Sequence, residues 1–271
     1  MEGLEALTSL TKLELYDNQI LSMACMESLG RLVVLDLSYN LIKSLAPLRH
    51  CPLLEEVYVA QNRIRVIEGL DGATRLRKLD LGANRIRRIE GLANCMVLEE
   101  LWLGKNKIDV IANLDTLGQL RRLDVQASCL LNRLTRISGL ERLSALEELY
   151  LAGNAILTAA ADCGSGGAAC AAAAAAGSAP LAAQAALSTL DLSRNRLTDF
   201  DGLLHLTELE DLWMTSNGID TFEKVEQLQV LSRLETLYLE HNPIYKDFEY
   251  RMRTARILPS LKQLDATEVR R

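Results

Sequence analysis

One short segment recurs along the whole chain and constrains its fold more than any other feature of the sequence. Nine copies fit the pattern L-x-x-L-x-L-x-x-N-x-L, with Val or Met in place of some Leu, for example LTKLELYDNQI, LRKLDLGANRI and LETLYLEHNPI. The first five asparagines of the pattern are 22 residues apart, at Asn18, Asn40, Asn62, Asn84 and Asn106. A fixed period of this length predicts stacked units in which neighbours bury each other's apolar faces.

The pattern also predicts the structure of each unit. The alternation L-x-L is typical of a short strand with its Leu side chains turned inward, pairing in parallel with the strand of the next unit. The Asn can satisfy backbone groups of the tight turn that follows. Return segments such as IEGLDGATRL carry small or apolar residues every third position, as 3₁₀ turns do. The fold class we expect is α/β: a leucine-rich-repeat solenoid with a curved parallel sheet on its concave face, short helices on its convex face, and a C-terminal cap.

A tenth, degenerate repeat occupies the segment LRRLDVQASCLLNRLTRI. Its NRLTRISGL resembles NRIRRIEGL, so we take Asn132 as its turn asparagine, with Ser128 as the alternative. The first choice implies a bulge of four extra residues after the strand, at about 127–130.

The domain organisation follows from where the repeats stop. We expect a solenoid of about ten repeats over residues 1–244, with an Ala- and Gly-rich disordered insertion at 157–186, and a cap over 245–271. In the cap, Tyr250–Leu258 is expected to be helical, Pro259 to end the helix, and Leu261–Leu264 to form a half-repeat. The N-terminus has no such cap, so either the native chain begins earlier or this end is unprotected.

Composition excludes several classes of function. A net charge of −6 disfavours nucleic-acid partners. Cys51 and Cys95 occupy apolar repeat positions, no C-x-x-C pair occurs, and the start lacks a secretory signal, so we expect a reduced protein of the nucleus and cytoplasm. The uncharged stretch Gly167–Leu187 lies between repeats and is interpreted as a loop, with no membrane association. We expect no enzyme, no catalytic residues, no cofactor and no metal.

The variable position inside L-x-L is the most informative one for function. All ten of these residues are acidic or aromatic, although aromatics are only 4% of the chain: Glu14, Asp36, Tyr58, Asp80, Trp102, Asp124, Tyr150, Asp191, Trp213 and Tyr238. One interpretation is that Asp is a habit of the repeat and Tyr a good strand former. The other is a protein-binding surface in which aromatic anchors lie among carboxylates. Flanking acids, Glu56, Glu100, Glu148 and Asp211, would then favour a partner with a basic patch.

The sequence also resembles a known family. The 22-residue repeats, the segments LYDNQI and LWLGKNKI, and the ending LPSLKQLDATEV are similar to the leucine-rich-repeat regulatory subunit of protein phosphatase 1, regulatory subunit 7. The resemblance implies that the concave face binds the phosphatase catalytic subunit, with a further phosphatase inhibitor as a candidate third member of the complex. The family's contact positions correspond to Tyr58, Asp80, Trp102, Asp191, Asp211, Trp213 and Tyr238.

The sequence therefore predicts a monomeric regulatory subunit that controls the activity, maturation or location of the phosphatase. Adding the strip residues Asp124 and Tyr150 to the family positions completes the predicted contact surface. The short R/K-V-x-F docking motif of many phosphatase partners does not occur. The alternative is a repeat scaffold of an axonemal, dynein-associated or spliceosomal assembly.

Overall fold

The computed structural model describes residues 3–127, 134–160 and 180–269. The chain forms two compact units, Met1–Arg133 and Leu134–Arg271. The predicted division between repeats and cap, after residue 244, falls inside the second unit. The predicted bulge at 127–130 and both candidates for the tenth asparagine, Asn132 and Ser128, fall wholly or mostly outside the described residues.

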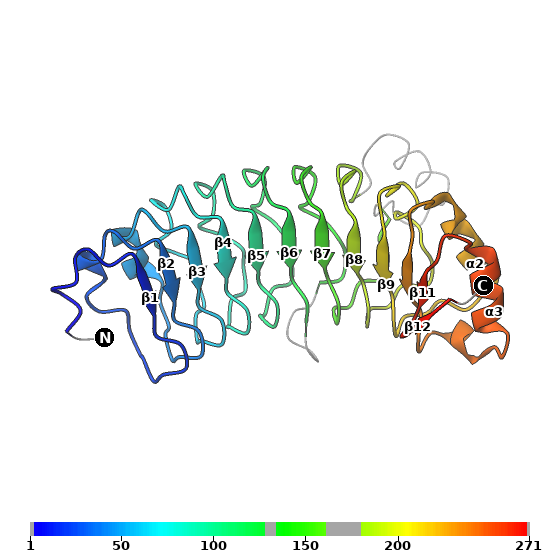
Figure 1. Cartoon of the computed structure of the whole chain (residues 1–271), viewed down its shortest axis with the longest axis horizontal. Helices are drawn as coiled ribbons and strands as arrows, with labels where there is room; N and C mark the ends of the chain where they lie inside the picture. Colours follow the sequence, from blue (N-terminus) through cyan, green and yellow to red (C-terminus); the bar gives the residue numbers. More distant parts are fainter. Residues whose placement is uncertain (1–2, 128–133, 161–179, 270–271) are drawn as a thin grey trace. The chain divides into compact units, whose positions relative to one another are not determined.

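The first unit is a stack of parallel strands in chain order (Figure 1). The strands are β1 Lys12–Glu14, β2 Val34–Asp36, β3 Glu56–Tyr58, β4 Lys78–Asp80, β5 Glu100–Trp102 and β6 Arg122–Asp124. Each pairs with the next in a register of 22 residues, so that Leu79 lies opposite Leu101 and Leu101 opposite Leu123. This confirms the predicted parallel β-solenoid.

The second unit continues the same pattern and then ends it. Its strands are β7 Glu148–Tyr150, β8 Thr189–Asp191, β9 Asp211–Trp213, β10 Thr236–Tyr238, β11 Gln263–Leu264 and β12 Thr267–Glu268. Strands β7 to β11 pair in parallel. The last strand, β12, turns back and pairs antiparallel to β11, which sequence analysis did not predict.

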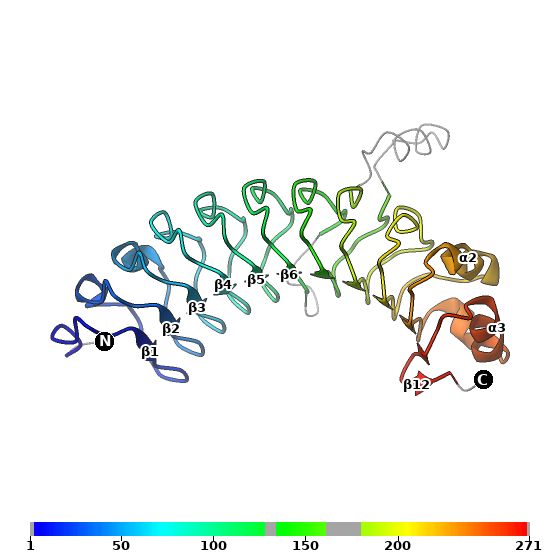
Figure 2. The same ribbon diagram turned by 45° about the horizontal axis from the view of Figure 1, so that its top comes forward.

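The core lies behind the strands and is almost wholly aliphatic. The middle residue of each strand is buried, and so is the apolar residue that follows the strand. Figure 2 shows the strands of the first unit in a row, with the connecting segments of each coil extending above and below them. The alternation of buried and half-buried residues in each strand is the one that the L-x-L pattern predicts.

The turn asparagines form a hydrogen-bonded series that we call the Asn ladder. At Asn84, the side-chain nitrogen donates to the carbonyl of Val59 in the preceding repeat at 3.0 Å, and to the carbonyls of Leu81 and Gly82 in its own turn. The side-chain oxygen accepts the backbone N–H of Ile64 at 3.0 Å. The same arrangement recurs at Asn40, Asn62 and Asn106, and in the second unit at Asn195, Asn217 and Asn242. Each rung therefore joins two turns.

The return segments are successive tight turns. In the repeat that leads to β4, Ala73 N–H donates to the carbonyl of Leu70, and Leu76 N–H to that of Ala73. Short 3₁₀ helices occupy some return segments: η1 Met26–Ser28, η2 Ala46–His50 and η3 Leu228–Val230. Cys51 and Cys95 are fully buried there, which confirms that they act as small core residues.

Gly91 shows why glycine recurs in the return segments. Its φ is +71°, a conformation that side chains rarely adopt. A Cβ at this position would also collide with the carbonyl group of Ile67 in the preceding repeat. The close stacking of adjacent repeats therefore requires glycine here.

The C-terminal end of the second unit is helical. The return segment after β9 contains α2, Phe222–Gln227, a true helical turn that sequence analysis did not distinguish from the other segments. After β10 come η4, Pro243–Lys246, and α3, Tyr250–Ile257, which ends next to the helix end predicted from Pro259. Arg253 of α3 packs its guanidinium 3.7 Å from the ring centre of Phe222 in α2, which holds the two helices together.

The predicted insertion is described only at its two ends. Ala159 is buried, and Gln184 and Leu187 donate the same N–H bonds, three residues back, that occur in other return segments. Residues 161–179 lie outside the described residues. Among the residues that are described, no helix is long and apolar enough to cross a bilayer.

Candidate protein-binding surface

The third residue of every strand from β1 to β10 lies on the sheet face opposite the core. We call these ten residues the strip: Glu14, Asp36, Tyr58, Asp80, Trp102 and Asp124 in the first unit, and Tyr150, Asp191, Trp213 and Tyr238 in the second. Most are half-buried against their neighbours, whereas Glu14 is exposed and Asp191 is 8% exposed. Strand alternation places all of them on this face, as the sequence predicts.

The aspartates of the strip hold the turns that follow the strands. One carboxylate oxygen of Asp80 accepts the backbone N–H of Gly82 at 2.8 Å. Asp36, Asp124 and Asp191 make the equivalent bond to the residue two positions on. This local role accounts for the recurrence of L-D-L without reference to a partner. Burial raises the pKa of Asp80 and of Asp191, against the opposing effect of these N–H bonds.

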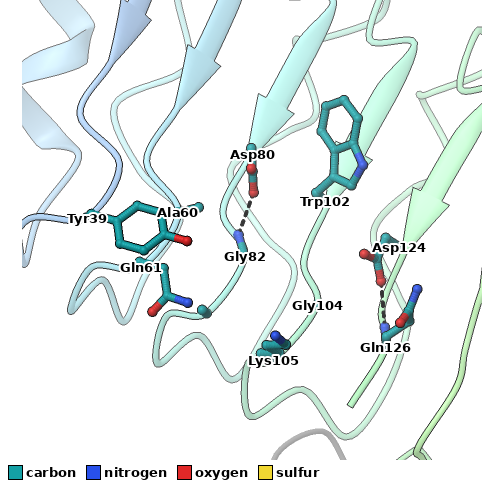
Figure 3. A pocket seen from close by; sticks show the side chains of 11 residues that line it. Tyr39, Ala60, Gln61, Asp80, Gly82, Trp102, Gly104, Lys105, Asp124 and Gln126 are labelled. Atoms are coloured by element: carbon teal, nitrogen blue, oxygen red, sulfur yellow. Dashed lines mark hydrogen bonds between the residues drawn. The ribbon is translucent and has the colours of Figure 1, made fainter. Parts of the chain in front are cut away.

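Trp102 is the centre of the strip in the first unit. The sheet register sets it between Asp80 on β4 and Asp124 on β6. Beside the indole lies a hollow of about 230 Å³, whose floor is made of small residues of successive turns (Figure 3). Gly104 contributes to this floor. A side chain there would crowd Asp124, because its Cβ would lie 3.1 Å from a carboxylate oxygen of that residue.

The rim of the hollow adds residues that sequence analysis did not select. Tyr39 and Gln61 stand at one end, Gln126 at the other, and Lys105 lies between them (Figure 3). They come from the turns rather than from the strands, so the L-x-L pattern does not reveal them. The 22-residue period could have indicated them, because residues 22 apart in successive turns are neighbours, as they are in successive strands.

This arrangement suits a partner's cationic side chain. An Arg or Lys over the Trp102 indole would gain a cation–π contact and lie near the two carboxylates of Asp80 and Asp124. An aromatic ring on a floor of small residues also offers apolar area to a partner at low entropic cost. Both features are common at the energetic centres of protein interfaces.

The first residues of the strands form a second column, which is less acidic than the sequence analysis expected. Glu100 on β5 lies 3.4 Å from Lys78 on β4 and 3.7 Å from Arg122 on β6, so the carboxylate is paired on both sides. Glu56 accepts the hydroxyl of Tyr58 at 3.0 Å. Burial and this neighbouring carboxylate raise the pKa of Tyr58 to about 12.

In the second unit the strip contains an aromatic cluster. The Trp213 ring centre lies 6.2 Å from that of Tyr150 and 6.2 Å from that of Tyr238, in tilted and edge-on orientations. The indole N–H of Trp213 is buried, and among the described residues nothing accepts it. Tyr150 donates its hydroxyl to Glu148 at 2.6 Å, and Gln263 of β11 donates to the Tyr238 hydroxyl at 2.5 Å. The cluster is therefore held in place before any partner binds.

The predicted contact residues divide between the units. Tyr58, Asp80, Trp102 and Asp124 lie together in the first, and Tyr150, Asp191, Trp213 and Tyr238 in the second. Asp211 belongs to the column of first residues, where it accepts the Thr189 hydroxyl at 3.4 Å. Across the described residues, no three His, Cys, Asp or Glu side chains gather as a metal site would require.

Comparison with known proteins identifies the fold and shows sequence similarity over part of the chain. A family model described as Leucine Rich repeats (2 copies) matches residues 186–229. The crystal structure of an internalin C2 from Listeria monocytogenes matches with a TM-score of 0.65 at 23% identity, over 77% of this chain and 82% of that one. At this identity the likeness concerns the fold alone.

Curated relatives match over shorter stretches. Protein phosphatase 1 regulatory subunit pprA of Dictyostelium discoideum is 40% identical over 70 residues, 26% of this chain and 20% of that protein. Protein phosphatase 1 regulatory subunit 7 of Mus musculus is 42% identical over 52 residues, 19% of this chain and 14% of that protein. Centrosomal protein of 72 kDa of Mus musculus is 38% identical over 86 residues, 31% of this chain and 13% of that protein.

The matched part of the chain thus spans a fifth or less of each of these relatives. The chain has the leucine-rich-repeat fold, and over part of its repeats it is similar to regulatory subunits of protein phosphatase 1.

Proposed function

We propose that this chain is a non-catalytic regulatory subunit that binds the catalytic subunit of protein phosphatase 1 through the strip. It would control the activity, maturation or location of the phosphatase. The observation that carries the proposal is the strip itself: both tryptophans of the chain lie on it, each between acidic or aromatic neighbours. The similarity to two phosphatase regulatory subunits supports this choice of partner.

The chemistry of the strip supports a partner with basic side chains. Asp80 and Asp124 each use one carboxylate oxygen in a turn bond, and that bond holds the carboxylate beside Trp102. Preorganised groups lose little entropy on binding, so their contacts contribute most of their interaction energy to affinity. In the second unit, the contacts of Trp213 with Tyr150 and Tyr238 hold its indole in place in the same way.

Two substitutions test the proposal. Trp102→Ala and Trp213→Ala are each expected to weaken binding of purified phosphatase catalytic subunit by about 2 kcal/mol, roughly thirty-fold in Kd, as interface anchors do. Calorimetry gives the affinity, and a thermal melt verifies that the fold is intact. Phe248→Ala is the matched control, because Phe248 is an aromatic residue 96% exposed in the cap and away from the strip. Normal binding by both tryptophan variants would rule out the strip as the phosphatase site.

The second candidate is a repeat scaffold of a larger assembly. The similarity to the centrosomal protein supports this candidate. It covers a longer stretch than either phosphatase match, at a slightly lower identity. Affinity capture from the native cell separates the two. Recovery of a type 1 phosphatase supports the first, whereas recovery of axonemal, centrosomal or spliceosomal components without phosphatase supports the second.

Assembly state and location complete the proposal. We expect a monomer in the absence of the phosphatase, because the net charge of −6 disfavours self-association. Light scattering of the purified chain would test this. We further propose a nuclear and cytoplasmic location and a ternary complex with a phosphatase inhibitor, which imaging of a tagged chain and co-purification would test.

A further inference from the structure

A basic ridge runs along the turn side of the first unit, outside the strip. We define it as six residues in two columns that follow the Asn turns: Arg63, Arg85 and Lys107 in one column, and Lys43, Arg65 and Arg87 in the other. All six are exposed. Within each repeat they alternate with buried isoleucines, such as Ile64 between Arg63 and Arg65, so both columns face outward on the same side.

The spacing of the ridge is fixed by the backbone. Arg63 N–H donates to the carbonyl of Ile42, Arg85 N–H to Ile64, and Lys107 N–H to Ile86, each at 2.8 Å. These bonds stack the cationic residues of neighbouring repeats at the strand spacing of about 4.8 Å. Two rows of cations at this distance repel one another and cost stability unless an anion is near.

The cations of the ridge make no ion pair with the described part of the chain. Among the residues that the structure describes, none of the six takes part in an ion pair. By contrast, Lys78 and Arg122 on the strand face both pair with Glu100. Glu68, the nearby acid after Arg65, accepts the Ser44 hydroxyl. The chain as a whole has a net charge of −6, so this concentration of unpaired positive charge is local.

The ridge is also restricted to part of the chain. Asp109 takes the place that Arg87 holds one repeat earlier and so ends the second column. In the second unit, the equivalent positions of three described repeats are Ala155 and Leu157, Arg196 and Thr198, and Gly218 and Asp220, so the one cation among them, Arg196, has no cation at these offsets in either neighbouring repeat. A general habit of the repeat would have placed cations at most of these positions. The restriction favours a specific anionic partner over a general need for solubility.

We propose that the ridge binds an acidic peptide segment of a partner protein. The proposal goes beyond the phosphatase-binding strip and does not depend on it. Three steps of about 4.8 Å make the ridge roughly 14 Å long, which an extended chain at ~3.3 Å per residue covers with about five residues. Guanidinium groups in pairs suit bidentate recognition of Asp and Glu carboxylates.

A peptide fits the ridge better than a nucleic acid does. Val66 and Val110 are 44% and 46% exposed on the same edge, next to the cationic columns. They offer apolar contacts to the side chains that lie between carboxylates in a peptide, whereas a phosphate backbone gains nothing from them. Single-stranded nucleic acids also rely on aromatic stacking, and none of the ridge residues is aromatic.

Fluorescence polarisation with a labelled synthetic peptide tests the proposal. The probe alternates Glu and Val over about ten residues, twice the expected contact length. The double variant Arg85→Glu with Arg87→Glu is expected to lower its affinity by roughly tenfold or more. The matched control reverses two exposed cations of the cap, Lys246→Glu with Arg256→Glu, and is expected to bind as the parent does.

Further measurements make the outcome unambiguous. Arg85→Lys with Arg87→Lys keeps the charge but loses the bidentate geometry, so its affinity should lie between those of the parent and the Glu variant. A thermal melt of each variant verifies that a loss is not caused by misfolding. Trp102→Ala should leave peptide binding unchanged, and the Arg85/Arg87 reversal should leave phosphatase binding unchanged, so the two proposals fail independently. Equal loss in the ridge and control variants would overturn the proposal, as would tighter binding of a single-stranded oligonucleotide or of phosphatidylserine vesicles than of the peptide.

Discussion

At the scale of single residues, the Asn ladder shows how a side chain can substitute for secondary structure. Asn84 bonds three carbonyls and one N–H of two turns. Its bonds to Val59, Leu81 and Ile64 are buried, where water cannot replace the amide. The free energy of unfolding should therefore depend on this residue more than on most exposed ones.

Asn84→Ala is expected to lower the free energy of unfolding by about 2–4 kcal/mol, because buried backbone groups lose their partner. Urea unfolding followed by circular dichroism would measure it. Asn18→Ala is the control: Asn18 is exposed and donates only within its own turn, to Leu15 and Tyr16, so a loss under ~1 kcal/mol is expected. Equal losses for the two would contradict the role of the ladder.

The buried cysteines give a second prediction at this scale. Burial raises the pKa of the Cys51 and Cys95 thiols to about 11, so almost no thiolate exists at neutral pH. In the native protein both should resist N-ethylmaleimide, and both should react once the chain is unfolded in denaturant. Peptide mass spectrometry resolves the two sites. Rapid native labelling of either would show that its return segment opens readily.

The sequence predicted the residues of the ladder and the core, because their period is fixed by the stack. It did not predict the turn bonds of the strip aspartates, although L-D-L followed by a small residue carried that information. It also missed the pairing of Glu100 with Lys78 and Arg122, which depends on knowing that residues 22 apart are neighbours across the sheet.

At the scale of elements, the cap closes the second unit through one buried acid. Asp265 accepts the N–H groups of Leu239 and Glu240 after β10 with one oxygen. With the other it accepts the hydroxyl of Tyr250 from α3 at 3.0 Å. Arg251 of the same helix donates to the carbonyls of Leu264 and Thr267. By the sheet register, Asp265 occupies the position that Tyr238 holds one repeat earlier, and its carboxylate ties the helix to the last strands.

This arrangement predicts a loss of stability in alkali. Burial, and then the neighbouring Asp265, raise the pKa of Tyr250 far above its ordinary value. Above about pH 10 the unfolded chain releases this proton while the folded chain retains it, so the unfolded state gains. Below that pH the tyrosine is neutral in both states, and its contribution is fully present.

Tyr250→Phe should therefore be less stable than the parent near neutrality, through the lost hydrogen bond, yet lose less stability as pH rises past about 10. Urea unfolding on both sides of that pH measures the difference, and the remaining tyrosines cancel because both proteins contain them. A parallel decline in the two proteins would show that Tyr250 ionises freely in the folded state.

Element boundaries were predictable where a period or a breaker marks them. Helix α3 was expected from Pro259 and the end of the repeats. Helix α2 was not separated from ordinary return segments, since Phe222, Val225 and Leu228 fit the spacing of three that 3₁₀ turns also show. The two-residue strand β12 has no sequence pattern, because its pairing depends on the turn at Asp265.

At the scale of the whole molecule, charge of opposite sign is sorted onto different surfaces. The strip carries carboxylates and aromatic rings, while the ridge of the first unit carries exposed cations. The net charge of −6 conceals this separation. The acidic surface was predictable, because its residues lie at a fixed position within the strands. The basic surface was not, because its residues lie in the segments that join the strands, where no pattern marks them.

The acidic surface predicts a salt effect on phosphatase binding. Affinity should fall modestly as ionic strength rises, because exposed charges are screened within about 10 Å at 0.1 M salt. Asp80→Asn keeps an oxygen that can accept the Gly82 N–H but removes the charge, so its affinity should depend less on salt. Titrations at two salt concentrations measure both slopes. An affinity indifferent to salt would leave the aromatic residues as the sole source of binding.

The way each asparagine bonds to its own turn and to the preceding one has a consequence for how such a chain can change. Every rung in the first unit meets the same surroundings, so one whole repeat can be gained or lost there without leaving a carbonyl or an N–H unsatisfied. Each such event would move the residues beyond it by one step of about 4.8 Å. The binding surface of this molecule can therefore be lengthened or shifted only by whole repeats, in steps of about 4.8 Å.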